Sequence, residues 1–419
     1  ARSARDAAPG FSPGCSRSAG VLQHLAAAQR RCYTGAVAEP SDPPTTPLPE
    51  LRDQLDAVDR QVLELLARRM QIVSAVARYK RAENIGIRDA RREEQVLAAR
   101  RQLARELGLD PESIESIYRQ ILLSSRDYQA AMNLAGAPAG EPKTVLIVGG
   151  AGAMGGVLAG LFRELGHHVL IADLGTHPRA EALVAQADVV VISVPIAVTE
   201  AVIQQLGPLV RADAVLIDVT SIKAAPMTAM LHATQASVIG THPLFGPGSS
   251  TLIGQRVVLC RGRGDQWYQW LADSLKARGL TITESGAEEH DRAMALVQVL
   301  THFQTQVFGL ALARMDIPLE TSRRYTSPAY LMELYVAARH FAQAADLYGP
   351  IEMRNPATSE VTAQFQRAAQ EIAEILASGD QTRFAAMFQE VRAFFGDFAQ
   401  EATEQSRFLI DRLVERSLT

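Results

Sequence analysis

Residues 144–155 read Thr-Val-Leu-Ile-Val-Gly-Gly-Ala-Gly-Ala-Met-Gly, an apolar run that leads into a glycine-rich turn. The turn has the spacing G-x-G-x-x-G, and an apolar segment typical of a helix follows at 157–165. A strand that passes through such a turn into a helix places free backbone N–H groups and a helix N-terminus around a pyrophosphate. We therefore predict a domain that binds a dinucleotide. The expected cofactor contacts in this turn are Gly150, Gly152, Ala153, Met154 and Gly155.

A second apolar run, 169–172, ends at Asp173, close to the offset of about 20 residues at which such domains place an acid. This carboxylate would accept a hydrogen bond from a ribose 2′-hydroxyl and repel a 2′-phosphate, which favours NAD over NADP. Apolar runs recur at 187–195, 214–219 and 237–240, the pattern of a doubly wound, largely parallel sheet. Ligands bind beyond the carboxyl ends of such strands. Ser193 and Pro195 stand there as further expected cofactor contacts.

Composition narrows the class of protein. The chain has 419 residues, 47% of them hydrophobic and 21% charged, with a formal net charge of -4. This length suits two or three globular domains, and the charge does not favour nucleic acid or membrane as a partner. Its three cysteines, Cys15, Cys32 and Cys260, have neither metal-ligand nor disulfide spacing. We expect a cytoplasmic protein without a metal site.

The first 46 residues differ from the rest. They are rich in Ala, Arg, Ser, Gly and Pro and nearly free of acids before Glu39. Such a segment buries too little apolar surface to offset its ordering entropy, so we predict a disordered extension. An Arg-rich, acid-poor leader is also typical of an organellar transit peptide, and that alternative stays open.

The next segment has the apolar spacing of a long helix, alternating four and three residues as in a heptad seam. Arg69 takes one position of this seam. Lys80, eleven residues later, differs from it by only about 20° in direction and lies about 16 Å further along the axis. We expect both cations to face one interior, where an anion must pair with them. The seam consists of Leu51, Leu55, Val58, Val62, Leu65, Ile72, Val76 and Tyr79.

More polar residues follow this helix, and Ser125 and Gln129 lie four residues apart on one face of a second predicted helix, 111–132. Over about residues 48–132 the arrangement resembles the all-helical class of chorismate mutase. The resemblance implies an intertwined homodimer in which Arg52 comes from the partner subunit. It implies that Lys80 and Gln129 stabilise the negative charge that develops on the ether oxygen as its bond breaks. Its other chorismate-binding positions are Arg69, Asp89, Arg92, Glu93 and Ser125. A module that only dimerises the chain is the alternative.

Two segments stand beyond the later strands: Asp-Val-Thr-Ser-Ile-Lys at 218–223 and Thr-His-Pro-Leu-Phe-Gly-Pro at 241–247. His242 in the second is placed to take a hydroxyl proton while hydride leaves the same carbon. After about Gly286 the pattern predicts only helices, at 288–315, 327–345, 358–376 and 382–413. Such a domain usually closes a substrate cleft and forms a dimer.

These segments resemble prephenate dehydrogenase over about residues 143–415. The resemblance implies oxidative decarboxylation of prephenate to 4-hydroxyphenylpyruvate with NAD, His242 accepting the proton and Ser221 orienting His242 or the substrate. Arg339 would bind a substrate carboxylate, and Lys223 would lie near the cofactor or substrate. His302 and Tyr348 match positions linked to pocket shape and to inhibition by L-tyrosine. Roles for His290 and Asp291 stay open, and Leu331 departs from the family's arginine.

The predicted fold is therefore multidomain. An all-α, chorismate mutase-like module at 47–132 and a linker at 133–142 precede an α/β Rossmann domain at 143–285 and an all-α dimerisation domain at 286–419. Three alternatives remain: a preference for arogenate over prephenate, a regulatory mutase-like module, and a β-hydroxyacid dehydrogenase. The last would lack the 241–247 turn and would leave the helical module unexplained.

Overall fold

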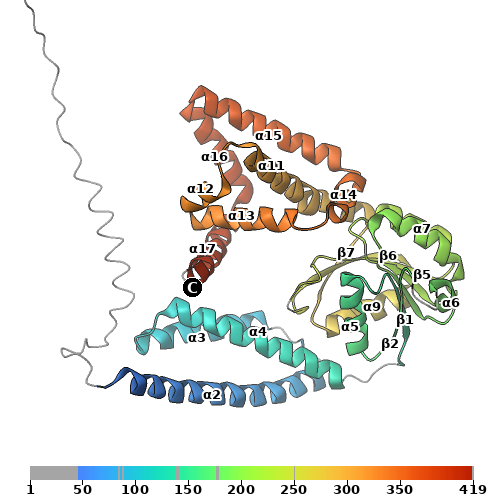
Figure 1. Ribbon diagram of the computed structural model, residues 1–419. Helices are drawn as coiled ribbons and strands as arrows, with labels where there is room; N and C mark the ends of the chain where they lie inside the picture. The colour runs from blue at the N-terminus through green and yellow to red at the C-terminus, as the bar shows by residue number, and fades with distance from the viewer. Residues whose placement is uncertain are drawn as a thin grey trace, which may run out of the picture. The chain divides into compact units, whose positions relative to one another are not determined.

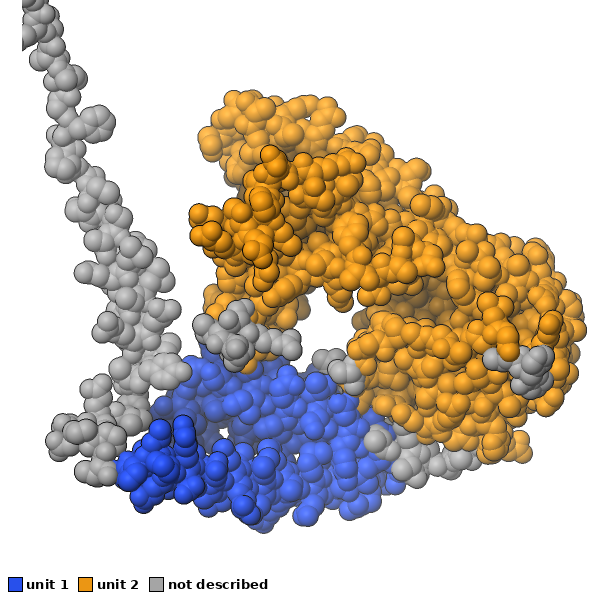
Figure 2. All heavy atoms as spheres, viewed as in Figure 1, with its two compact units in different colours: residues 1–137 blue, residues 138–419 orange. Residues whose placement is uncertain are grey.

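The computed structural model describes residues 46–83, 85–86, 89–136, 141–175, 179–249 and 251–417. They belong to two compact units. The first unit ends at residue 137 and the second begins at residue 138 (Figure 2). The predicted disordered extension lies outside the described residues, apart from Thr46. Among the described residues, no helix is both long and apolar enough to span a bilayer.

The first unit is a three-helix module: α2 (Leu48–Ala82), α3 (Ala90–Glu106) and α4 (Pro111–Gly136), as Figure 1 shows. Asp89 caps α3, because its carboxylate accepts a hydrogen bond from the backbone N–H of Arg92. The helix α4 packs against both α2 and α3. It continues through Gly136, four residues into the segment predicted as a linker.

The heptad seam predicted for α2 is not the face that this chain buries. Val73 and Ala77 are the buried residues of the helix, and Arg69 and Lys80 are half-buried on the same side. The buried face is rotated from the seam by one residue, about 100°. Beyond Leu51, which is half-buried, the seam residues are exposed: Leu55, Val58, Val62, Leu65, Ile72, Val76 and Tyr79. The reason is that α4 covers one side of α2 only and leaves the apolar stripe bare within the unit.

The second unit begins with a seven-stranded sheet in the order β2-β1-β3-β4-β5-β6-β7. The first five strands in this order are parallel, as the sequence predicts, whereas β6 runs antiparallel to β5. The last strand, β7, is parallel to β6. The strands are β1 (Thr144–Val148), β2 (His168–Ala172), β3 (Val189–Ile192), β4 (Val215–Asp218), β5 (Ser237–Pro243), β6 (Arg256–Arg263) and β7 (Thr281–Ser285).

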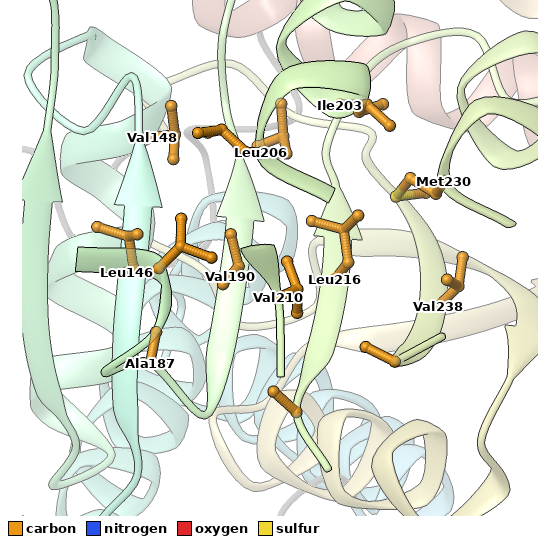
Figure 3. Close-up of a cluster of buried hydrophobic side chains, with 14 of the residues drawn as sticks. Leu146, Val148, Ala187, Val190, Ile203, Leu206, Val210, Leu216, Met230 and Val238 are labelled. Carbon is orange, nitrogen blue, oxygen red and sulfur yellow. The ribbon is translucent and has the colours of Figure 1, made fainter. Parts of the chain in front are cut away.

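Helices cover both faces of this sheet, because successive residues of the buried strands point to opposite sides. Leu146, Val190 and Leu216 pack with α6 (Ala180–Val184), α7 (Ile196–Leu206) and α8 (Ala224–Ala233), the cluster of Figure 3. Val145, Val191 and Ile217 pack with α5 (Ala153–Glu164) and α9 (Asp265–Ala277) on the other face. Both faces are therefore dry, and polar chemistry is left to the ends of the strands.

The last strand ends at Ser285, and the elements described after it are all helices (Figure 1). The predicted helix 288–315 has a π-helical segment within it, and the predicted helix 382–413 is broken at Gly396, which has φ +50°. The structure adds α12 and α14. The elements are α10 (Ala287–Met294), η2 (Ala295–Leu300), α11 (Thr301–Arg314), α12 (Leu319–Arg324), α13 (Pro328–Phe341), α14 (Ala345–Arg354), α15 (Thr358–Ser378), α16 (Gln381–Phe395) and α17 (Phe398–Ser417).

Candidate functional sites

The turn between β1 and α5 leaves no room for side chains. A Cβ atom on Gly155 would lie 2.3 Å from the carbonyl oxygen of Gly149, and one on Gly150 would lie 2.8 Å from the Ile171 side chain. Gly152 is the N-cap of α5 and offers no side chain to its first turn, which contains Ala153 and Met154. The N–H groups at this helix start are therefore available to an anion, as a pyrophosphate cradle requires.

Asp173 and Ser193 border this turn. The Asp173 carboxylate accepts a hydrogen bond from the N–H of Ala151 at 2.9 Å, which holds it beside the glycines. Ser193 follows β3, and its carbonyl oxygen would lie 2.2 Å from a Cβ on Gly149. Pro195 is the N-cap of α7 at the same edge of the sheet. The N–H groups at the start of α5 and the Asp173 carboxylate fit a nicotinamide dinucleotide, with the carboxylate where a ribose hydroxyl would bind.

Lys223 lies in the core of the second unit. Its side chain has no exposure, and Nζ forms an ion pair with Asp218 inside the core. Thr220 completes the cluster, since its hydroxyl donates to Asp218 at 2.6 Å. A cation removed from water needs such partners. The ammonium is therefore held in an ion pair inside the core, and a contact of Lys223 with the cofactor or the substrate stays a prediction.

His242 is the second-last residue of strand β5 rather than part of a loop, and only 3% of its surface is exposed. Its Nδ1 lies 2.9 Å from Nε2 of His290 in α10. Its Nε2 lies 3.4 Å from the amide nitrogen of Gln298 in η2. Burial, followed by the neighbouring His290 and Lys223, holds the pKa of His242 well below its ordinary value of 6.5. The imidazole is therefore neutral at physiological pH and able to act as a base.

His290 continues the chain of contacts, because its Nδ1 lies 2.8 Å from Oδ1 of Asp291. Both ring nitrogens of His242 thus have neighbours other than Ser221, which does not orient this imidazole through a direct hydrogen bond. Sequence reasoning left His290 and Asp291 open and missed Gln298. The motif Glu-His-Asp at 289–291 was the available signal, although nothing local showed what it would contact.

The helical part of this unit gathers another group of rings. His302 packs edge-on against Tyr348 with centroids 4.8 Å apart, and His340 stacks on the same ring at 4.0 Å. Gln306 donates to Glu352 at 2.8 Å and lies 3.2 Å from Nε2 of His340. Thus the predicted pair His302 and Tyr348 is brought together, with three polar neighbours that the sequence did not indicate. Arg339 is exposed on α13.

In the first unit, the structure brings Arg69, Ser125 and Gln129 together. Arg69 Nη1 donates to the Ser125 hydroxyl at 2.5 Å, and Gln129 Nε2 donates to the Ser125 carbonyl oxygen at 3.2 Å. The side-chain oxygen of Gln129 is buried and has no hydrogen-bond partner among the described residues. Lys80 donates from Nζ to the carbonyl oxygen of Gly86 at 3.2 Å.

The remaining predicted mutase residues are more exposed. Asp89 serves as the cap of α3, and the side chain of Arg92 is exposed. Glu93 is held by Arg126 of α4 in an ion pair of 3.0 Å, a partner that sequence reasoning missed. Arg52, near the start of α2, is exposed as well. The structure therefore groups Arg69, Ser125 and Gln129 within one chain and leaves Arg52 outside that group.

Three family models match the chain in this order. Chorismate mutase type II matches residues 51–130. The nucleotide-binding domain of prephenate dehydrogenase matches residues 163–284, and its dimerization domain matches residues 286–390.

Among the described residues, no group of three or more His, Cys, Asp or Glu side chains is placed to hold a metal ion.

Similar proteins have the same arrangement. A T-protein of Enterobacter agglomerans is 38% identical over 87% of this chain and 97% of its own length. A T-protein of Haemophilus influenzae is 34% identical with the same coverage. A prephenate dehydrogenase from Aquifex aeolicus, solved with hydroxyphenyl propionate and NAD+, has a similar fold over 60% of this chain and 96% of its own. The TM-score is 0.50 and the identity is 19%. The chain therefore belongs to the T-protein family of bifunctional chorismate mutase/prephenate dehydrogenases.

Proposed function

We propose that the protein rearranges chorismate to prephenate in its first unit and converts prephenate to 4-hydroxyphenylpyruvate in its second, using NAD. The observation that carries the proposal is the position of His242. It is a buried, neutral imidazole at the carboxyl end of β5, the same edge of the parallel sheet that holds the glycine turn.

The first reaction needs no nucleophile, because the rearrangement is pericyclic. What it needs is a rigid set of cations that holds a dicarboxylate in a compact conformation. The contact between Arg69 and Ser125 supplies that rigidity, and a guanidinium can bind a carboxylate with two parallel hydrogen bonds. Lys80 and Gln129 lie on the facing helices and would stabilise charge on the ether oxygen as the bond breaks.

In the second reaction His242 would accept the proton of the ring hydroxyl at Nε2. A bound dinucleotide supplies the acceptor for the hydride that leaves the same carbon. Loss of carbon dioxide then makes the ring aromatic, and Arg339 would hold a substrate carboxylate, with His302 and Tyr348 shaping the pocket. Asp173 beside the glycine turn supports NAD rather than NADP, because its carboxylate would repel a 2′-phosphate.

We further propose that the protein works as a cytoplasmic homodimer inhibited by L-tyrosine. The seven exposed apolar residues on one stripe of α2, Leu55 to Tyr79, support a second copy as the partner of that face. In such a dimer Arg52 would complete the mutase site of the other subunit. Similarity of residues 286–390 to a dimerization domain supports a further contact between subunits.

The test supplies chorismate with and without NAD to the purified full chain and identifies the products. We expect prephenate without NAD, and 4-hydroxyphenylpyruvate, carbon dioxide and NADH with it. A parallel assay with arogenate and prephenate compares the two as substrates. If chorismate is not consumed, the mutase proposal fails, and if added prephenate is not oxidised, the dehydrogenase proposal fails.

A further inference from the structure

The proposed base and two further side chains form a buried line of hydrogen bonds. His242 in β5 contacts His290 in α10 at 2.9 Å, and His290 contacts Asp291 at 2.8 Å. The three residues are 3%, 1% and 2% exposed, so water does not screen the line. The two imidazole planes meet at 67°, an edge-on arrangement that points a ring nitrogen of each toward the other.

Asp291 at the end of the line is held as a carboxylate. Its oxygens accept hydrogen bonds from the backbone N–H groups of Lys223 at 2.7 Å and Ala224 at 2.9 Å, at the start of α8. Burial alone would raise the pKa of Asp291, but the hydrogen bonds from His290, Ala224 and Lys223 outweigh it and hold the pKa below its ordinary value. The side chain of Asn355 fixes the segment, because it donates to the backbone oxygen of Asp291 at 2.7 Å.

This arrangement determines where the protons lie. A carboxylate has no proton to donate, so Nδ1 of His290 must carry the hydrogen between His290 and Asp291. When His290 carries this single ring proton its Nε2 is bare, and the hydrogen in the next contact belongs to Nδ1 of His242. Nε2 of His242 is left with its lone pair directed away from the line. The side-chain amide of Gln298 lies 3.4 Å from that atom.

We propose that His290 and Asp291 are positioning residues for dehydrogenation, which hold His242 in the tautomer whose Nε2 accepts the substrate proton. They also stabilise the charge that follows. When a proton reaches Nε2, His242 becomes an imidazolium in a dry site. Its Nδ1 proton can pass to Nε2 of His290, which places the positive charge beside the Asp291 carboxylate and leaves His242 neutral. This inference rests on the proposed dehydrogenase function and adds two residues to it.

The test is the variant Asp291→Asn in the full chain. The single oxygen of an asparagine can accept from the N–H of Ala224, while its amide nitrogen takes the place of Oδ1 and loses the hydrogen bond from Lys223. That nitrogen then donates to Nδ1 of His290 and reverses both tautomers, which removes the lone pair of His242 at Nε2. In an Asp–His pair of known mechanism the same change lowers kcat about 10⁴-fold through the wrong tautomer. We expect a fall in kcat of about 10²- to 10⁴-fold, with KM for prephenate, NADH binding and mutase activity within threefold. A kcat near that of the unaltered protein would overturn the proposal.

The matched control is Asp265→Asn, which removes an exposed acid at the start of α9 without touching the line. A second measurement is made on the unaltered chain: the ¹⁵N chemical shifts of the histidine rings. The signals of His242 are assigned by their absence from the variant His242→Asn. We expect a protonated Nδ1 and a bare Nε2 on His242, and the reverse tautomer would overturn the inference. If the unaltered protein does not oxidise prephenate, the proposed function fails, and these shifts still decide the tautomer.

Discussion

The guanidinium of Arg69 in α2 donates a hydrogen bond to the hydroxyl of Ser125 in α4, at 2.5 Å and across 56 positions of the chain. Ser125 is 4% exposed, and its hydroxyl donates a hydrogen bond to the carbonyl oxygen of Ile121 at 2.6 Å. The contact therefore connects two helices and orients the cation. It engages one of the five N–H donors of the guanidinium, which leaves donors in a fixed fork for a carboxylate.

Replacing Arg69 by alanine should remove mutase activity without unfolding the module. Each lost hydrogen bond to a charged group is worth about 1.5–3 kcal/mol, so kcat/KM for chorismate should fall about 10- to 150-fold for each bond. The control is Arg78→Ala on the same helix, where the arginine is exposed and donates a hydrogen bond to Ser74 at 2.9 Å. Mutase assays of both variants, with dehydrogenation of added prephenate as a fold check, make the comparison. Equal mutase rates in the two variants would contradict the assignment.

Two adjacent glycines in α5 make a matched pair for the cofactor turn. A Cβ on Gly155 would meet the backbone of Gly149 at 2.3 Å, whereas a Cβ on Gly156 would meet nothing within 4 Å. Gly155→Ala must therefore push the turn apart and should weaken NAD binding at least tenfold. Gly156→Ala should leave binding unchanged and stabilise the helix by about 0.5–1 kcal/mol. Titration calorimetry and thermal unfolding measure the two effects. An undisturbed affinity in the Gly155 variant would show that the turn is not the cradle.

The sheet and its glycine turn could be predicted because their signals are local. Alternating apolar runs mark buried parallel strands, and the turn follows its strand within a few residues. The antiparallel β6 escaped prediction because strand direction is set by pairing with β5, not by the composition of 256–263. Likewise, the heptad spacing of α2 correctly indicates a long helix, but it does not say which stripe α4 will cover.

Long-range side-chain contacts were the part that the sequence could not supply. The contact between His242 and His290 joins residues 48 positions apart, and no periodicity encodes it. Lys223 is a second example. Its spacing did not indicate that Asp218, five positions earlier, would pair with it inside the core. Charged residues near a site are therefore poorly assigned by spacing when a buried partner of opposite charge is within reach.

The choice between NAD and NADP should depend on Asp173. Its carboxylate accepts the N–H of Ala151 beside the glycine turn, so its charge stands where a ribose phosphate would lie. Asp173→Asn keeps the size of the side chain and removes the charge. We expect the ratio of kcat/KM for NAD to that for NADP to fall at least tenfold. The control is Asp213→Asn, an acid exposed on the surface and paired with Arg211. If Asp173→Asn leaves the ratio unchanged, the carboxylate does not select the cofactor.

The pH dependence of dehydrogenation should reveal the buried base. Burial, then His290 and Lys223, keep the pKa of His242 well below 6.5, and only the neutral imidazole can accept a proton. The rate is therefore expected to stay near its maximum as the pH falls to 6.5 and to drop only well below it, as His242 becomes protonated. The measurement is kcat/KM for prephenate between pH 5 and 9. The control is the variant His232→Gln, which removes an exposed histidine of α8 and should leave the pH dependence unchanged. A half-maximal rate at pH 6.5 or above would mean that the base is a solvated histidine, in conflict with the burial that makes His242 the candidate.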